Sequence, residues 1–280
     1  MRLVTYESGQ GPRPGLLDEG GVLDLSGDFA DIHDLIATAA GSGLPASLRE
    51  GPRLPLAGVT LLAPIRPRKN VFAIGRNYIE HVREIRGVTA VEPPPHPIVF
   101  TKPPTAVIGP GQAIDTSNDP SSTTDYEGEL GVVIGPGGRL IDPSRAMGHV
   151  FGYTIVNDVT ARALQRGHGQ WLMGKGPDTF CPMGPCILTA DEVDDVTTLE
   201  VVTDVNGEVR QRGSLADLIF DIPTLIATLS SVMTLEPGDV IATGTPSGVG
   251  AGFDPPRFLQ AGDVVTVTVE PIGVLTNPVI

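Results

Sequence analysis

Glycine and proline interrupt this chain throughout its length, and this feature constrains the possible folds more than any other. The 280 residues include 35 Gly and 27 Pro, spread along the sequence rather than gathered in one tail. Both residue types end helices and mark turns. The segments between them are short and rich in β-branched residues, as strands are. We therefore expect an α+β protein that is mainly β, and the 40% share of hydrophobic residues is enough for a real core.

The predicted elements divide the chain into a small N-terminal part and a larger remainder. Residues 1–65 contain two short strand signals, Arg2–Tyr6 and Val22–Leu25, a helical stretch at Asp31–Ala40 and a Pro-rich exit. We predict a small N-terminal domain there and a second, larger domain over residues 66–280. In the larger part, strands are expected at Val71–Ile74, Ile98–Thr101, Glu129–Ile134, His149–Val156, Leu199–Val205 and Val264–Val269.

Two local signals predict a turn and a helix in the larger part. Asn206-Gly207 separates two strand-like segments, which is typical of a type I′ hairpin. Further on, Asp221 can cap a helix whose first turn accepts Pro223. Six apolar residues then fall on one helical face, which predicts that this face packs against the core. They are Ile222, Leu225, Ile226, Leu229, Val232 and Met233.

The chain is strongly acidic, with a formal net charge of −14. An acidic surface repels phosphate backbones and anionic membrane faces, so we expect neither nucleic acid nor a membrane as a partner. The sequence has no apolar run of the roughly 18 residues that a membrane span needs, and its N-terminal segment lacks the apolar core of a secretory signal. We therefore expect a cytoplasmic protein whose two cysteines, Cys181 and Cys186, stay reduced.

Three acidic residues lie at the ends of two segments that we expect to be buried strands. Glu127 and Glu129, in DYEGELGVVIG, are two residues apart and share one face of a strand. Two carboxylates so close repel each other unless a cation neutralises them. In VFGYTIVNDVTAR the strand signal ends at Asp158, whose carboxylate can complete an all-oxygen site. Such oxygen donors suit Mg²⁺, Mn²⁺ or Ca²⁺ rather than zinc. A Glu-x-Glu pair by itself is also common on solvated strands that bind no metal.

A histidine and a glutamate three residues apart form a second candidate pair. His81 and Glu84, in GRNYIEHVREIRG, share a face if the segment is helical. The carboxylate can then orient the imidazole as a base. The same spacing is also typical of an ordinary ion pair on a helix surface. The residues from Arg86 to Pro97 are rich in proline and polar residues, which favours a loop that closes over a site.

Several cations and one glycine-rich segment are placed to bind an anionic substrate. Arg162 and Gln165 follow the third carboxylate on one helical face, and an arginine can bind a carboxylate with two hydrogen bonds. Lys175 stands among glycines in MGKGPDTF, and Lys102 in FTKPP is a further candidate. The late segment TGTPSGVG offers Thr245 and several backbone amides. No GK[ST] follows it, which argues against a nucleotide-binding loop.

The order of the motifs is more specific than any one of them. Six follow one another from about Asn70 onward: GRNYxxHxxE, FxKP, DYEGELGVVIG, NDVTAR, a Lys ahead of DTFxPxGP, and LEPGDVIxTGTPxGVG. Together they closely resemble the fumarylacetoacetate hydrolase family. The resemblance is strongest to the branch that holds acylpyruvases, 2-hydroxyhepta-2,4-diene-1,7-dioate isomerases and oxaloacetate decarboxylases. Six motifs in the same order make a chance likeness remote.

The resemblance implies a mixed β-roll domain, a homodimer, and Mg²⁺ or Mn²⁺ as cofactor, with Ca²⁺ as a substitute in crystals. By position, the metal ligands would be Glu127, Glu129 and Asp158. The catalytic residues would be His81, Glu84 and Lys175. The substrate-binding positions of the family match Arg162, Gln165, Lys175 and Thr245, and Lys102 is a substrate-binding candidate from its own context.

The reaction implied by this resemblance starts from a small 2-oxo acid bound to the metal, which favours an enolate. In the hydrolytic version the dyad activates water, and a C–C bond of an acylpyruvate or fumarylpyruvate breaks. We expect this hydrolysis because decarboxylation needs no activated water. Three alternatives stay open, since a fold does not determine a reaction. They are decarboxylation of oxaloacetate, isomerisation of 2-hydroxyhepta-2,4-diene-1,7-dioate, and dehydration of a sugar acid.

Overall fold

The computed structural model describes residues 1–280 except 43, 45–47, 49 and 87–91, and its strands form three sheets. The largest sheet has twelve strands: β1 (Arg2–Glu7), β2 (Pro12–Asp18), β3 (Gly21–Asp24), β4 (Arg53–Leu54), β5 (Thr60–Leu62), β6 (Val71–Gly75), β7 (Ile98–Lys102), β8 (Val107–Ile108), β10 (Gly128–Ile134), β11 (Val150–Asn157), β13 (Cys181–Thr189) and β16 (Val240–Ala242). A four-stranded sheet contains β14 (Glu200–Val205), β15 (Glu208–Ser214), β17 (Val264–Val269) and β18 (Gly273–Pro278), and a small pair contains β9 (Thr124–Asp125) and β12 (Thr160–Ala161). The α-helices are α1 (Ile32–Ser42), α2 (Ile79–Arg86), α3 (Arg162–Gly167), α4 (Leu172–Lys175) and α5 (Ile222–Val232).

The large sheet has β10 and β11 near its middle, in the order β4-β3-β2-β1-β13-β11-β10-β16-β6-β7. All seven residues of β10 are buried, as its apolar run predicted. The N-terminal strands continue the same sheet, because Arg2 of β1 pairs with Leu188 of β13. Residues 1–65 therefore share a sheet with the rest of the chain, and a separate domain ending at residue 65 stays a prediction.

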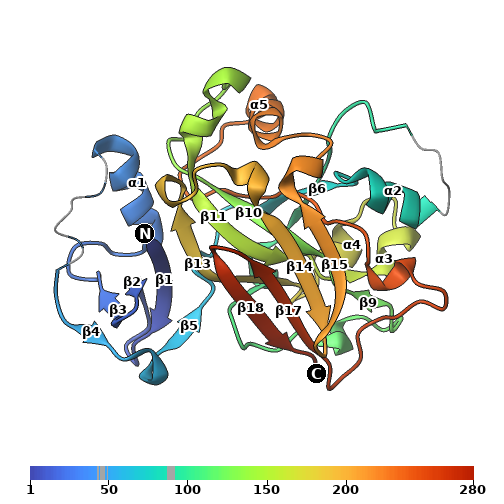
Figure 1. Cartoon of the computed structure of the whole chain (residues 1–280), viewed down its shortest axis with the longest axis horizontal. Helices are drawn as coiled ribbons and strands as arrows, with labels where there is room; N and C mark the ends of the chain where they lie inside the picture. The colour runs from blue at the N-terminus through green and yellow to red at the C-terminus, as the bar shows by residue number, and fades with distance from the viewer. Residues whose placement is uncertain (43, 45–47, 49, 87–91) are drawn as a thin grey trace.

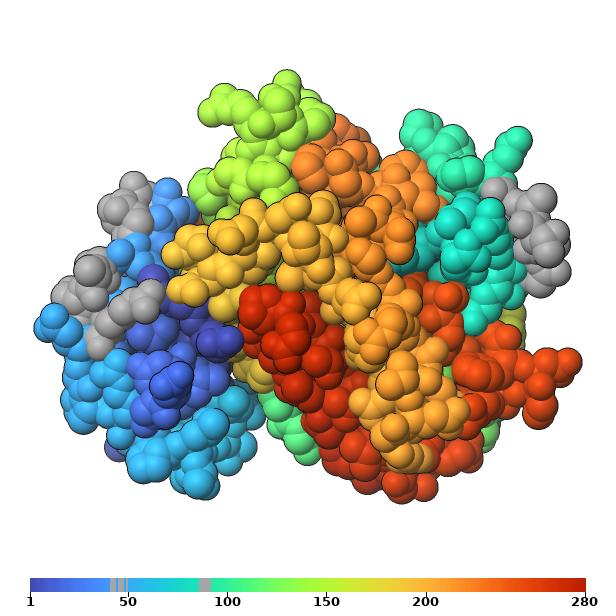
Figure 2. All heavy atoms as spheres, viewed as in Figure 1, coloured from blue at the N-terminus to red at the C-terminus, as the bar shows by residue number. Residues whose placement is uncertain are grey.

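Two layers cover the large sheet. The four-stranded sheet packs on one face, where Val201 and Val267 join Val132 of β10 in one apolar cluster. α1 packs on the opposite face, where Ile36 belongs to a cluster with Val133. Neighbouring residues of β10 thus point to opposite layers, as a strand requires. Figure 1 shows the four-stranded sheet in front of β10 and β11, with α2, α3 and α4 gathered on the side away from α1. In Figure 2 the N-terminal residues form one side of the molecule, and the C-terminal strands cross the visible face.

The predicted hairpin and helix cap are confirmed, but the predicted apolar face of the helix is shorter than expected. Val232 is 69% exposed, and Met233 lies beyond the end of α5. Asn206 and Gly207 have φ values of 56° and 79°, as a type I′ turn between β14 and β15 requires. The carboxylate of Asp221 accepts a hydrogen bond from the amide of Thr224 at 2.9 Å and begins α5. The expected α+β fold with mainly strands is therefore the observed one. In the described part of the chain, no helix is both long and apolar enough to cross a membrane.

Candidate active site

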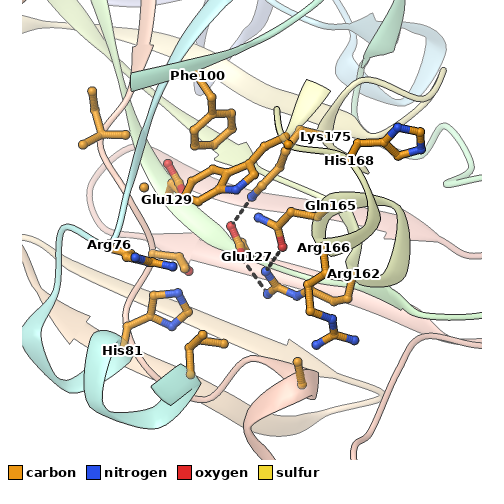
Figure 3. Close-up of a pocket in the computed structure, with 17 residues that line it drawn as sticks. Arg76, His81, Phe100, Glu127, Glu129, Arg162, Gln165, Arg166, His168 and Lys175 are labelled. Atoms are coloured by element: carbon orange, nitrogen blue, oxygen red, sulfur yellow. Dashed lines mark hydrogen bonds and ion pairs between the residues drawn. The ribbon is translucent and has the colours of Figure 1, made fainter. Parts of the chain in front are cut away.

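A cavity of about 400 Å³ lies where β6 and β10 meet α2, α3 and α4. Figure 3 shows Glu127 near its middle, with Arg76 and His81 on one side and Arg162 and Gln165 on the other. The residues that line it are Ile74, Gly75, Arg76, His81, Ile85, Phe100, Glu127, Glu129, Arg162, Gln165, Arg166, His168, Gly169, Trp171, Lys175, Thr245 and Ala251. Its volume suits a small metabolite.

The three predicted metal ligands come together because β10 and β11 are antiparallel neighbours. Gly128 pairs with Asn157. Glu127, which precedes Gly128, therefore lies beside Asp158, which follows Asn157. The amide of Asp158 donates to the carbonyl of Glu127 at 2.8 Å. One carboxylate oxygen from each of Glu127, Glu129 and Asp158 lies within 4.8 Å of the others, and all three residues are buried. The structure thus places these carboxylates in one cluster.

The charges of this cluster do not balance by themselves. Burial raises the pKa of Glu129 well above its usual value, and the charges of Asp158 and Glu127 raise it further. Burial also opposes ionisation of Glu127. There, however, the positive charges of Arg162 and Lys175 outweigh burial and hold the pKa well below its usual range. Glu129 therefore holds a proton more strongly than a free carboxyl group does, and a further cation beside it would favour its ionised form.

Two buried lysines neutralise part of the cluster. The amine of Lys175 donates to Oε2 of Glu127 at 2.6 Å and also to Asp158. The amine of Lys102 donates to Oδ1 of Asp158 at 2.6 Å, to the carbonyl of Val159 at 3.0 Å, and to the carbonyl of Lys175. Lys102 is fully buried and is not among the described residues that line the cavity. Lys102 was expected to contact the substrate, but its amine instead contacts Asp158 and backbone carbonyls inside the protein.

Arg162 is held by a carboxylate that the sequence analysis missed. Its Nε donates to Oδ2 of Asp125 at 2.8 Å, while its Nη2 lies 2.6 Å from Oε1 of Glu127 without hydrogen-bond geometry. The Asp125 carboxylate also accepts the amides of Gly250 at 2.6 Å and Ala251 at 3.0 Å. Asp125 thus joins Arg162 to the loop that follows β16. Asp125 and its partners lie far apart in the sequence and form no recognisable motif. The sequence hinted at a role for Asp125 only through its place in DYEGE, next to the predicted metal ligand Glu127.

The donor set and the charge balance fit a divalent cation. Four carboxylates, those of Asp125 and the three-residue cluster, face three cations: Lys102, Lys175 and Arg162. With all four carboxylates ionised one negative charge is left over, and a divalent cation would turn this into one positive charge. A locally positive site can attract an anionic substrate in spite of the acidic surface of the chain. The all-oxygen donors and the raised pKa of Glu129 suit Mg²⁺ or Mn²⁺.

His81 and Glu84 lie on one face of α2, as their spacing predicted. Nδ1 of His81 is 3.3 Å from Oε2 of Glu84, and Oε1 of Glu84 accepts the amide of Gly248 at 2.8 Å. Glu84 also packs against Gly252, where an added Cβ would lie 2.3 Å from the carboxylate. Two glycines of the loop after β16 thus hold the Glu84 carboxylate beside the His81 ring. Of the loop expected to close over the site, residues 87–91 lie outside the described part of the chain.

The remaining predicted residues lie at the cavity wall. Gln165 lines it from α3, and Thr245 lines it from the segment after β16. The hydroxyl of Thr245 donates to the carbonyl of Gly128 at 2.9 Å. We expected the amides of TGTPSGVG to hold a substrate anion. Amides of this segment instead donate to carboxylates of the protein, as Gly244 does to Glu129 at 2.8 Å.

Comparison with known proteins agrees with this geometry. Residues 70–280 match the model of a family described as fumarylacetoacetate (FAA) hydrolase, C-terminal. The chain belongs to the fumarylacetoacetate hydrolase family. The matched residues make up three quarters of the chain and include every predicted site residue. The resemblance inferred from the six ordered motifs is thereby confirmed, and the family is one of enzymes.

Three similar proteins show the range of reactions on this fold. Oxaloacetate tautomerase YisK of Bacillus subtilis is 52% identical over 225 residues, which are 80% of this chain and 74% of YisK. A fumarylacetoacetate hydrolase of Exiguobacterium antarcticum is 42% identical with a TM-score of 0.88, covering 100% of this chain and 99% of that one. Maleylpyruvate hydrolase of Sphingobium sp. SYK-6, solved with manganese(II) and pyruvate, is 32% identical with a TM-score of 0.81, covering 100% and 99%.

Proposed function

We propose that this protein is a divalent-metal-dependent enzyme that interconverts the keto and enol forms of oxaloacetate. One observation carries the proposal: Glu127 and Glu129 of the carboxylate cluster line the same cavity as His81, whose ring is held by Glu84. A site for an electron-withdrawing cation and a candidate base thus face one small space. The 52% identity with an oxaloacetate tautomerase supports this choice among the reactions of the family.

The carboxylate cluster prepares the carbonyl end of the substrate. Mg²⁺ or Mn²⁺ held by Glu127, Glu129 and Asp158 would act as a Lewis acid that polarises the C2 carbonyl of a 2-oxo acid. Lys175 lies beside two of these ligands, and its ammonium group stabilises negative charge that develops on the C2 oxygen. Lys102 holds Asp158 in place from the buried side.

We assign the proton transfer at C3 to His81. Because Nδ1 is held by Glu84, Nε2 carries the lone pair that takes a proton from C3 of the keto form. The C3–H electrons become the C2–C3 double bond, and a solvent proton on the C2 oxygen completes the enol. In the reverse direction the enol oxygen loses its proton to solvent, the C2 carbonyl re-forms, and the imidazolium returns a proton to C3. A base placed in this way contributes about 10²–10⁴-fold to the rate.

Exchange of the C3 protons of oxaloacetate with solvent deuterium tests this function. Proton NMR would follow the exchange with MnCl₂ or MgCl₂, with EDTA, and without protein. We expect acceleration that needs both protein and metal and that is lost in His81→Asn. If the exchange rate with protein and metal equals the rate with metal alone, the proposed function is wrong.

Hydrolysis of a C–C bond in a 2,4-dioxo acid, the reaction expected from the sequence, is the second candidate. The His81–Glu84 pair favours it, because the same base can deprotonate water, and the similarity to a maleylpyruvate hydrolase agrees with it. Hydroxide would attack the C4 carbonyl, and the C3–C4 bond would break to give the pyruvate enolate and a carboxylic acid. Pyruvate release from acetylpyruvate or fumarylpyruvate identifies a hydrolase. Carbon dioxide release from oxaloacetate identifies a decarboxylase.

A further inference from the structure

Arg76 differs from the rest of the cavity wall in its backbone conformation. It follows β6, and its φ of 58° lies in the left-handed region that L residues seldom adopt. Among the described residues, five that are not glycine have such a φ, and Arg76 is the one of them that lines the cavity. Backbone strain of this kind is concentrated at functional sites, which suggests a functional role for the Arg76 side chain.

Both neighbours of Arg76 are closely held by the surrounding structure, which favours its backbone conformation. The Asn77 side chain is fully buried and makes hydrogen bonds at 2.8–3.0 Å to both backbone groups of Phe220 and to the carbonyl of Thr243. On the other side, a Cβ at Gly75 would lie 2.4 Å from the ring of Trp171. The chain therefore passes through Arg76 in one conformation, with the side chain at the cavity wall.

An aromatic pair supports the guanidinium group. The Arg76 Cζ atom lies 5.8 Å from the centre of the Trp171 ring, and Trp171 in turn meets Phe100 edge-on at 5.3 Å. Stacking uses the face of a guanidinium group, whereas its N–H donors lie in its plane. The aromatic support is therefore compatible with a bidentate contact to a carboxylate.

Arg162, the buried arginine of the cavity, lies at the carboxylate cluster. The Arg162 guanidinium group contacts Asp125, Glu127 and the side-chain oxygen of Gln165. Figure 3 shows Arg76 and Arg162 on opposite sides of Glu127. A substrate with negative charge at both ends thus needs a cation on the Arg76 side as well as the positive charge at the carboxylate cluster.

We propose that Arg76 binds a second carboxylate of the substrate, remote from the 2-oxo acid group, and so selects dicarboxylates over monocarboxylates. This inference rests on the proposed function, because it assumes that the 2-oxo acid end lies at the carboxylate cluster. The strained backbone then has a purpose, because it holds the guanidinium group on Trp171 directly after β6 ends.

Oxaloacetate and 2-oxobutyrate form a matched pair for the test, since a methyl group in the second replaces the distal carboxylate of the first. C3 exchange would be measured for both with Mn²⁺, in the unaltered protein and in Arg76→Gln. We expect the KM for oxaloacetate to rise at least about tenfold, as for a lost charged hydrogen bond, so that the preference for the dicarboxylate collapses. The proposal would be overturned if Arg76→Gln changed the KM of both substrates equally or left both KM values unchanged.

Two further variants separate recognition from folding. Arg76→Gly removes the side chain and relieves the left-handed strain, so its thermal midpoint is expected to equal or exceed that of the unaltered protein while the preference is lost. Arg166 lines the same cavity and is exposed, and Arg166→Gln should leave the preference unchanged. If Arg166→Gln abolishes the preference and Arg76→Gln does not, the second carboxylate binds elsewhere.

Calorimetry distinguishes a failure of this inference from a failure of the proposed function. If the unaltered protein accelerates exchange of neither substrate, the proposed function is wrong. Binding of the same two compounds to the Mn²⁺-loaded protein then tests Arg76 by itself. A loss of affinity for oxaloacetate alone in Arg76→Gln supports the inference, and equal affinities in both proteins contradict it.

Discussion

Nζ of Lys175 lies 2.6 Å from Oε2 of Glu127, with both side chains buried. The same amine also contacts Asp158, so the lysine stands between two of the proposed metal ligands. Burial lowers the pKa of this amine, but the charges of Asp158 and Glu127 outweigh burial and raise it. Lys175 therefore stays charged, and it competes with a divalent cation for the same oxygens.

Replacing Lys175 by Met removes this competing charge and keeps most of the side-chain volume. We expect the affinity for Mn²⁺ to rise, because two carboxylates lose a cation. We expect turnover to fall by about 10²–10³-fold, because a group that stabilises charge on the C2 oxygen is lost. Titration calorimetry with Mn²⁺ measures the first effect, and C3 exchange measures the second. Unchanged turnover would mean that Lys175 only balances charge.

Gly252→Ala should disturb the His81–Glu84 pair without replacing either residue. The added Cβ would lie 2.3 Å from the Glu84 carboxylate, which must shift from its present position beside His81. We expect kcat to fall by about ten- to a hundredfold, as for a misplaced catalytic group, while Mn²⁺ affinity stays the same. Gly148→Ala is the matched control, because its Cβ would meet nothing within 4 Å. An unchanged kcat in Gly252→Ala would argue against orientation of His81 by Glu84.

Asp125→Asn should lower the free energy of unfolding strongly. The change weakens the buried contact to Arg162, and we expect a cost of about 3 kcal/mol or more. Asp24→Asn provides the comparison, because the Arg13–Asp24 pair is partly exposed and contributes about 0–1 kcal/mol. Urea unfolding of both variants checks this. Equal losses in the two variants would contradict a special role for Asp125.

The stability contributed by Asp119 should depend on pH. Burial opposes its ionisation, but hydrogen bonds from Ser121, Thr123 and Thr124 outweigh burial and lower its pKa. A carboxyl group whose pKa is lower in the folded state stabilises the fold above its unfolded pKa of about 3.9. This contribution is lost as the pH falls through the lower, folded value.

Asp119→Asn is therefore expected to be less stable than the unaltered protein at pH 7, by about 1–3 kcal/mol. The gap should narrow as the pH falls below about 4, because Asp119 of the unfolded chain takes up a proton there before the folded carboxylate does. Thermal midpoints of both proteins at pH 7 and pH 3 measure this. A gap of the same size at pH 3 would show that the charge of Asp119 is not what matters.

Elements with local signals were predictable from the sequence, and long-range partners were not. The hairpin at Asn206-Gly207 and the cap at Asp221 depend on neighbouring residues, and both formed as predicted. The pairing of Arg2 with Leu188 joins the N-terminal strands to the large sheet. No local pattern predicts such a pair, because packing across the whole core selects it.

The candidate site shows the same division. Glu127 and Glu129 share a face by strand geometry alone, so their clustering was predictable. Lys102 was assigned to substrate because sequence reveals charge but not burial, and the structure surrounds its amine with protein acceptors. Asp125 was missed for the converse reason, since its contacts to Arg162 and Gly250 exist only in the folded chain.

C3 exchange of oxaloacetate during a Mn²⁺ titration of metal-free protein tests most directly whether the three carboxylates bind the cation that the reaction needs. The unaltered protein should be inactive in EDTA and should gain activity that saturates with Mn²⁺. Glu127→Gln should gain none, because it loses one ligand charge from the cluster. Exchange that is equally fast in EDTA, or full Mn²⁺-dependent activity in Glu127→Gln, would contradict the metal site.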